Sequence, residues 1–175
     1  MRHISFIRGI NVGKAKRVAM KELRALVGEL GFTNVRTLRN SGNVIFDTTR
    51  AKGKTASRKI EKELYARLGV AARVITLAED EWQVIITGNP LEEIATEPSR
   101  FLAAILENPE DRSLLLPLTQ QEWIPEIIEL NHRVAYLWCP GGVLASPLVK
   151  AVSGILGEKV TTRSWATMLK IDAMV

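Results

Sequence analysis

Three cations in one short loop are the side chains of this sequence best placed to bind a charged ligand. The loop Lys14-Ala15-Lys16-Arg17 stands directly before an expected helix that contains Met20. The first turn of a helix presents free N–H groups, and cations beside it strengthen the attraction for an anion. Arg8, Arg36 and Arg39 lie on adjacent expected strands, so one anion could meet cations from several segments. A solvated run of surface charge is the alternative interpretation.

Two glycine-containing segments are similar to phosphate-binding loops without matching one. The Walker pattern needs four residues between its glycines, followed by Lys and then Ser or Thr. In Gly9-Ile10-Asn11-Val12-Gly13-Lys14 three residues intervene, and Ala15 follows the lysine. Gly53-Lys54-Thr55 lacks the first glycine, because Thr48 occupies its position. We therefore expect no ATP site of the Walker type and interpret both segments as loops.

The remaining reactive residue types form no legible catalytic or metal site. His3 and His132 are far apart in the sequence and have no neighbouring ligands, so zinc is not expected. Cys139 ends an apolar segment, where a buried and inert thiol is typical. A single cysteine forms no internal disulfide and favours a reducing compartment. We expect no metal and no cofactor, and the sequence leaves open whether the protein is an enzyme.

Two further polar segments could line a ligand site. Ser41-Gly42-Asn43 has the residue types of a tight turn, because Gly and Asn tolerate positive φ, and its side chains could also line the mouth of a pocket. Arg163 stands at the start of an expected helix, where a cation is unfavourable for the helix dipole. A residue that breaks a local rule invites a functional explanation. The alternative is an ion pair with an acid of the second half.

The charge is split between the two parts of the chain. Residues 1–75 hold 17 of the 24 Lys and Arg but only 5 of the 19 Asp and Glu, and residues 76–175 hold the other 7 and 14. The net charge of +5 therefore hides balances of +12 and −7. A field of one sign attracts polyanions or an oppositely charged partner, and opposite fields can bring two halves together. The cations of the first part are expected in loops and strands.

The composition is that of a globular protein without a membrane segment. Of 175 residues, 46% are apolar and 25% are charged, which argues against disorder. Arg8 and Gly9 interrupt the first apolar stretch too early for a signal peptide, and no run of 18 apolar residues follows. We expect a cytoplasmic protein and no membrane association.

The hydrophobic pattern predicts the element order β-α-β-β-α-β twice. The first set has strands at 3–12, 35–39, 44–47 and 72–77, with helices over 20–30 and from an N-cap at Ser57 to Gly69. The second set has strands at 101–107, 126–130, 133–139 and 159–162, with helices that begin near Asn108 and Ser146. A helix from Glu79, a linker over 91–99 and a last helix over 164–172 complete the chain.

This order is that of the ferredoxin-like motif, an antiparallel sheet with two helices on one face. We therefore predict an α+β fold of two ferredoxin-like halves in tandem, packed together, with an extra C-terminal helix. Each half is the expected cover for the open sheet face of the other. The predicted division is 1–78 for the basic half, 79–99 for a helix and linker, and 100–175 for the acidic half with the C-terminal helix.

Motifs at both ends of the chain resemble those of the bacterial domain-of-unknown-function family numbered 1697. The motifs are Arg8-Gly9-Ile10-Asn11-Val12-Gly13, Met20 with Leu23, Gly31-Phe32, Val35-Arg36-Thr37, Ser41-Gly42-Asn43-Val44, and Thr162-Arg163-Ser164-Trp165 with Thr167 and Lys170. The resemblance implies an α+β fold with two ferredoxin-like halves and brings no established activity. Ser164 stands where the family usually has Asn, and in Ser146-Pro147-Leu148 the family commonly has a Lys before the Leu.

These observations lead to one principal hypothesis and two alternatives. We expect the motifs from both ends to converge in space. The candidate ligand-binding residues are Arg8, Asn11, Lys14, Lys16, Arg17, Arg36, Arg39, Ser41, Asn43, Arg163, Trp165 and Lys170. The principal hypothesis is that the basic N-terminal half, with Lys52 and Lys54, binds an anionic ligand, either a nucleic acid or a phosphorylated small molecule.

The first alternative is a small hydrolase or transferase with Arg8, Asn11, Asn43 and Arg163 around a cleft between the halves. The second is a protein-interaction module, which a large exposed apolar patch would favour. An RNA-recognition platform is disfavoured, because Phe46 is the only aromatic residue of the third expected strand. The oligomeric state stays open.

Overall fold

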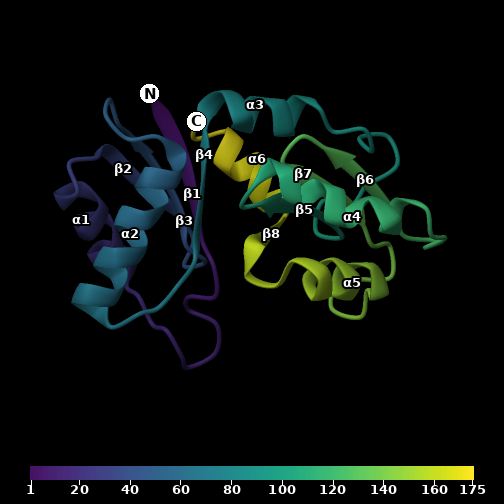
Figure 1. Cartoon of the computed structure of the whole chain (residues 1–175), viewed down its shortest axis with the longest axis horizontal. Helices are drawn as coiled ribbons and strands as arrows, with labels where there is room; N and C mark the ends of the chain where they lie inside the picture. The colour runs from purple at the N-terminus through teal and green to yellow at the C-terminus, as the bar shows by residue number, and fades with distance from the viewer. The chain divides into compact units, whose positions relative to one another are not determined.

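The computed structural model describes all of residues 1–175 and contains two compact units. The first unit comprises Met1–Trp82 and Val175, and the second comprises Gln83–Met174. Each unit contains a four-stranded antiparallel sheet with helices packed on it, so the predicted α+β class is confirmed (Figure 1). None of the helices has the length and apolar character needed to cross a membrane.

The first unit has the strand order β2-β3-β1-β4. Its elements are β1 (Arg2–Ile7), α1 (Met20–Glu29), β2 (Thr33–Leu38), β3 (Asn43–Asp47), α2 (Gly53–Leu68), β4 (Val74–Ala78) and the start of α3 (Glu79–Thr87). In Figure 1, α1 and α2 lie on the same side of this sheet. The core between them contains Ile7, Val44, Phe46 and Val74 from the strands, Leu23, Leu26 and Val27 from α1, and Ala56, Ile60 and Leu64 from α2.

This core follows from the apolar spacing of the sequence. Ile60 and Leu64 are one helical turn apart and both are fully buried, so α2 is fixed by one apolar stripe. Burial of each such side chain contributes about 1.5–3 kcal/mol. Gly69 ends the helix in the left-handed region at φ +64°, as the sequence predicted.

Two predictions for the first unit are wrong in detail. The first strand ends at Ile7 and not at Val12, because Gly9 and Asn11 have positive φ values of 74° and 55°, which strands do not accommodate. Helix α2 begins at Gly53, one turn before the expected N-cap. Ser57 is therefore inside the helix, where its buried hydroxyl donates to Oγ1 of Thr76 at 2.8 Å.

The second unit has the corresponding strand order β6-β7-β5-β8. Its elements are the remainder of α3, β5 (Phe101–Leu106), the short 3-10 helix η1 (Pro109–Asp111), α4 (Arg112–Thr119), β6 (Ile127–Asn131), β7 (Val134–Trp138), α5 (Pro147–Leu156), η2 (Gly157–Lys159), β8 (Val160–Ser164) and α6 (Trp165–Asp172). Two helices begin where the sequence predicted. Ser146 Oγ accepts from the Val149 N–H at 3.0 Å, and Ser164 Oγ accepts from the Thr167 N–H at 3.2 Å.

Candidate functional site

A tight hairpin presents the three cations of the basic loop. Val12 and Ala15 form an isolated β-bridge, and the Asn11 N–H donates to the Lys16 carbonyl at 3.0 Å. The hairpin reverses at Gly13 and Lys14, and Gly13 adopts φ +60°. The side chains of Lys14, Lys16 and Arg17 are exposed, and none of them forms an ion pair or a hydrogen bond. The loop therefore presents uncompensated positive charge on an ordered backbone.

Asn11, predicted as a ligand contact, is used by the fold to hold this hairpin. Its Nδ2 donates to the carbonyls of Val18 and Asn40, each at 2.8 Å, and its Oδ1 accepts from the Val18 N–H at 2.8 Å. All three bonds go to the backbone. The side chain closes the loop on itself and ties it to the turn between β2 and β3.

The turn between β2 and β3 is likewise built from the predicted site residues. Asn43 is fully buried, and its Nδ2 donates to the Leu38 carbonyl at 3.1 Å and to Ser41 Oγ at 3.0 Å. Gly42 has φ +76°, and its carbonyl accepts from the Ile7 N–H at 2.9 Å. The structure therefore brings the motifs at 8–13 and 41–44 together, and the amides of Asn11 and Asn43 hold the two loops.

The three remaining predicted arginines of the first unit, Arg8, Arg36 and Arg39, are close in sequence to the hairpin or to the turn between β2 and β3. Arg39 is exposed and has φ +55° directly after β2. Arg36 is half-buried on β2, opposite Ile45 of β3. Arg8 is half-buried, and its backbone N–H donates to the Arg73 carbonyl at 2.9 Å. The guanidinium groups of Arg8, Arg36 and Arg39 form no ion pair or hydrogen bond.

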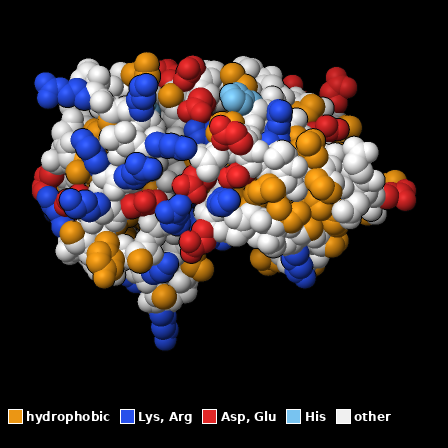
Figure 2. Space-filling view, viewed as in Figure 1, with side chains coloured by type: hydrophobic (Ala, Val, Ile, Leu, Met, Phe, Trp, Pro, Cys, Tyr) orange, Lys and Arg blue, Asp and Glu red, His pale blue; other side chains and the backbone are white.

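Helix α2 carries a second set of exposed cations that the sequence interpretation missed. Its solvent side, named here the outer face of α2, presents the cations Lys54, Arg58, Lys59 and Lys62 together with Thr55, Tyr65 and Ala66, all of them exposed. The expectation that the cations lie in loops and strands is wrong for this helix. Figure 2 shows Lys and Arg side chains gathered over the part of the view that holds α1 and α2 in Figure 1.

The signal for this face was present in the sequence. Lys54, Arg58 and Lys62 recur at four-residue intervals, out of phase with the buried stripe of Ala56, Ile60 and Leu64. Residues four apart on a helix lie on one face. The four-residue spacing of these cations, considered together with the apolar stripe, predicts that they lie on one face of the helix.

Most acids of the first unit have a partner within the unit. Glu61 accepts from the Val74 N–H at 2.8 Å, and Glu63 pairs with Arg67 at 2.9 Å. Arg67 also pairs with Glu29 of α1, and these two carboxylates, Glu29 first, raise the pKa of Arg67. The first unit holds 17 Lys and Arg but 8 Asp and Glu, whereas the second holds 7 and 11.

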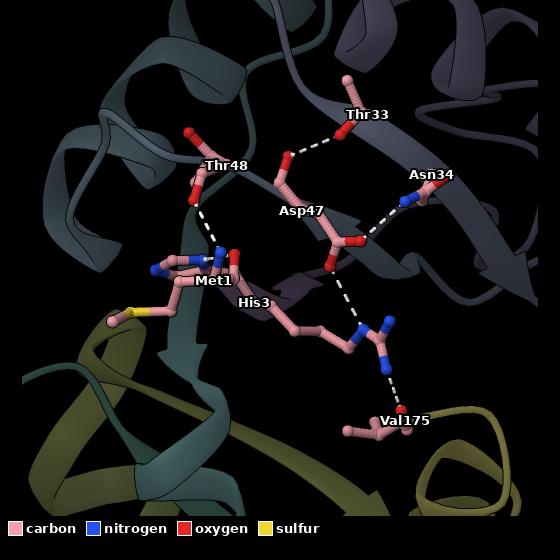
Figure 3. A network of polar contacts seen from close by, with 8 residues as sticks. Met1, His3, Thr33, Asn34, Asp47, Thr48 and Val175 are labelled. Carbon is pink, nitrogen blue, oxygen red and sulfur yellow. Dashed lines mark hydrogen bonds and ion pairs between the residues drawn. The ribbon is translucent and has the colours of Figure 1, made fainter.

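A polar network at the N-terminus uses another acid (Figure 3). Asp47 accepts from Asn34 Nδ2 at 2.8 Å and from Arg2 Nε at 3.1 Å, and these bonds hold the pKa of the Asp47 carboxyl below its ordinary value. Arg2 also donates to the Val175 carbonyl, and the α-amino group of Met1 donates to the Thr48 carbonyl at 3.0 Å. The Asp47 carboxylate is therefore held by two side chains of the fold.

The three predicted residues of the second unit have different environments. Arg163, on β8, donates from Nη1 to Thr161 Oγ1 and to the Thr162 carbonyl, each at 2.9 Å, and burial lowers the pKa of Arg163 to about 10. Trp165 is buried with its ring 5.0 Å from that of Phe101, so it belongs to an aromatic cluster. Lys170 is exposed near the end of α6. Their convergence with the N-terminal motifs stays a prediction.

A chain of polar contacts links Cys139, Ser146 and Glu126 in the second unit. The buried Cys139 thiol lies 3.5 Å from Ser146 Oγ, which donates to Glu126 at 2.5 Å. Burial raises the pKa of the Cys139 thiol, and Ser146 is engaged as the cap of α5. Glu126 lines a surface pocket of about 460 Å³, formed by the segment 119–128. The thiol is thus neutral near pH 7 and turned toward the interior, which does not suit a nucleophile.

The histidines belong to separate environments. His3 is buried and stacks on Phe46 with ring centroids 5.7 Å apart, and burial lowers the pKa of His3. His132 is exposed in the turn between β6 and β7. No group of three or more His, Cys, Asp and Glu side chains is placed to hold a metal ion.

Comparison with known proteins identifies a family model and a similar fold. The family model described as "Protein of unknown function (DUF1697)" matches residues 1–136. Among solved structures, the conserved bacterial protein SP0830 from Streptococcus pneumoniae is similar with a TM-score of 0.77, at 20% sequence identity, over 99% of this chain and 97% of that chain. No curated protein matched the chain. At this identity the structural likeness shows the fold alone.

Proposed function

The chain belongs to the bacterial family of proteins of unknown function numbered 1697, and from this starting point we propose that its first unit binds an anionic ligand. One observation carries the proposal: four of the five acids in residues 1–75 have partners within the unit, whereas most of its cations have none. The predicted site cations without a side-chain partner are Arg8, Lys14, Lys16, Arg17, Arg36, Arg39, Lys52 and Lys54. The positive charge of this unit is therefore available to a ligand.

The ligand-contacting loop in this proposal is the hairpin with Lys14, Lys16 and Arg17. Asn11 holds this hairpin through three backbone contacts, so little order has to be gained when an anion binds. Nucleic acids and phosphorylated small molecules both offer the phosphate oxygens that Lys and Arg bind. Arg163, Trp165 and Lys170 remain proposed contacts of the same ligand from the second unit.

We also propose that the chain consists of two ferredoxin-like halves in tandem, 1–78 and 100–175, joined by a helix and linker over 79–99. The proposal is supported by the element order β-α-β-β-α-β in each unit and by the equivalent strand orders β2-β3-β1-β4 and β6-β7-β5-β8. A cytoplasmic location is part of the same proposal, since the only cysteine is a free thiol.

The hydrolase or transferase alternative gains no support within either unit, because the amides of Asn11 and Asn43 donate to backbone carbonyls. The interaction-module alternative has one observation in its favour. Leu114, Leu116, Leu144 and Ile155 are exposed on or beside α4 and α5. Figure 2 shows hydrophobic side chains gathered over the part of the view that holds α4 and α5 in Figure 1. The test compares the molar mass in solution of the wild type and of Leu116→Lys. Equal masses would exclude self-association through this surface.

Binding to labelled oligonucleotides tests the proposed function. Fluorescence anisotropy at low salt should give dissociation constants on the order of 10⁻⁴ to 10⁻⁶ M. The variant Lys14→Ala/Lys16→Ala/Arg17→Ala should bind more weakly, whereas Arg112→Ala/Lys150→Ala/Lys159→Ala, which removes three cations of the second unit, should bind as the wild type does. Inorganic pyrophosphate serves as the small-ligand probe, followed by amide shifts in residues 9–18.

Two results would refute parts of this proposal. If neither oligonucleotide nor pyrophosphate binds at about 50 micromolar protein, within the range of non-specific affinities, the first unit is not an anion-binding module. If oligonucleotides bind but the loop variant is unaffected, the hairpin is not the contact. In that second case the charge acts elsewhere on the unit.

A further inference from the structure

We infer that the outer face of α2 is a docking surface for the phosphate backbone of duplex nucleic acid. This inference rests on the proposed function and deepens it, because it names a polymer as the ligand and a second surface as its main contact. The face was not among the residues that the sequence singled out, apart from Lys54. Its cations lie on one helix, whereas the hairpin cations Lys14, Lys16 and Arg17 lie in a loop.

The geometry of α2 sets the cations in a row. Lys54, Arg58 and Lys62 occupy successive turns, and each four-residue step rises about 6 Å along the helix. The row is therefore about 12 Å long, with Lys59 beside it. The opposite side of the helix is fixed in the core by Ala56, Ile60 and Leu64, so the row is held outward.

The charge arrangement of α2 is unfavourable for the helix itself. Cations four residues apart repel each other, and cations in the first turn oppose the helix dipole. The first turn of α2 contains no acid, whereas α3 of the same chain begins with Glu79, Asp80 and Glu81. The acids that could relieve the row are engaged elsewhere, because Glu61 binds the Val74 N–H and Glu63 binds Arg67. A local cost of this kind is expected where charge serves binding.

The shape of the face selects among anionic ligands. A helix surface is convex, and a single small phosphate compound is normally bound in a concave site. A membrane-binding helix needs large apolar residues on the membrane side, but the aliphatic stripe of α2 is buried in the core, and only Tyr65 and Ala66 are exposed. Single strands are held by several stacking aromatics, and this face has only one. A duplex backbone offers a regular row of phosphates that needs nothing but cations.

The face also predicts how sequence-dependent the binding is. Reading of bases uses Asn, Gln or well-oriented Arg side chains in the major groove. The outer face of α2 contains no Asn or Gln, and three of its four cations are lysines. We therefore expect phosphate contacts without sequence preference, and a strong dependence on salt.

The experiment compares two variants that each lose three cations of the first unit. Lys54→Ala/Arg58→Ala/Lys62→Ala removes the α2 row, and Lys14→Ala/Lys16→Ala/Arg17→Ala removes the hairpin cations. Alanine is the best helix former, so the α2 variant should fold, which its circular dichroism verifies. For a short duplex we expect at least about tenfold weaker binding by the α2 variant, with the slope of log K against log salt reduced by about 2.7. The charge-conserving variant Lys54→Arg/Lys62→Arg should keep the salt dependence of the wild type.

The possible results separate this inference from the proposed function. If the hairpin variant is weakened and the α2 variant binds duplex as the wild type does, the inference is overturned and the proposed function stands. If a single strand or a poly-glutamate peptide displaces the duplex at equal charge, or anionic vesicles bind more tightly through these residues, duplex nucleic acid is the wrong partner. If no oligonucleotide binds to the wild type, the inference fails, and pyrophosphate binding alone decides the proposed function.

Discussion

Substitution of Gly42 by alanine should be among the most damaging single-methyl changes in this protein. An added Cβ would lie 2.9 Å from both Cβ and the carbonyl oxygen of Ile7, and 3.1 Å from Cδ1 of Ile10. Ile7 and Ile10 are buried, and the Ile7 N–H is bonded to the Gly42 carbonyl at 2.9 Å, so neither neighbour can move away freely. In addition, Gly42 has φ +76°, which alanine disfavours.

The structure offers two control positions, one that shares only the positive φ of Gly42 and one that shares neither the positive φ nor the close contacts. Gly9 has almost the same φ, +74°, but nothing lies within 4 Å of an added Cβ. Gly9→Ala therefore loses only the conformational component, about 1–2 kcal/mol. Gly42→Ala loses that amount and a further 1–3 kcal/mol, approximately, from overpacking. Gly28, in α1, has neither problem, and Gly28→Ala should stabilise by about 0.5–1 kcal/mol.

Urea denaturation followed by far-UV circular dichroism gives the free energies of unfolding of the wild type and the three variants. The expected order of stability is Gly28→Ala, wild type, Gly9→Ala and Gly42→Ala. Equal losses for Gly42→Ala and Gly9→Ala would refute the reasoning, because they would mean that the approach of Gly42 to Ile7 costs nothing. An effect confined to the unfolding slope, with no change of midpoint, would point to the unfolded state instead.

Three further predictions concern other parts of the first unit. Asn11→Ala should cost about 1–3 kcal/mol through three lost backbone contacts and speed hydrogen exchange in residues 11–18; unchanged exchange would show that Asn11 does not hold the hairpin. Lys54→Glu should raise the free energy of unfolding by about 1 kcal/mol, because an acid enters the first turn and faces Arg58 four residues on, and it should weaken duplex binding; lower stability would contradict the dipole argument. Burial lowers the pKa of His3 in the folded protein, so the unfolded chain takes up the proton first, and stability should fall as the pH drops below about 6.5. Urea midpoints of the wild type and His3→Gln between about pH 7.5 and 5 test this, since equal pH slopes would exclude a contribution from His3.

Local sequence information determined the elements of this protein and several of their ends. The apolar residues Ile60 and Leu64 predict α2 because their spacing matches one helical turn, and Gly69 predicts its end because glycine adopts positive φ without strain. Ser146 and Ser164 predict helix starts for a similarly local reason, since each hydroxyl bonds an N–H three residues ahead. The order of strands and helices, the α+β class and the excess of cations in the first part of the chain followed from such patterns.

Only the tertiary structure decided which polar side chains are left for a ligand. Asn11 looked like a contact residue, but it bonds Asn40, which is 29 residues away, and no local pattern reports that distance. Ser57 resembled a helix cap, but its hydroxyl meets Thr76 of β4 inside the unit. The same holds for charge: Glu61 and Glu63 stand among the cations in the sequence, yet the fold directs them to Val74 and Arg67. A charge is free or compensated according to its neighbours in space, and those neighbours come from segments that the chain brings together only when it folds.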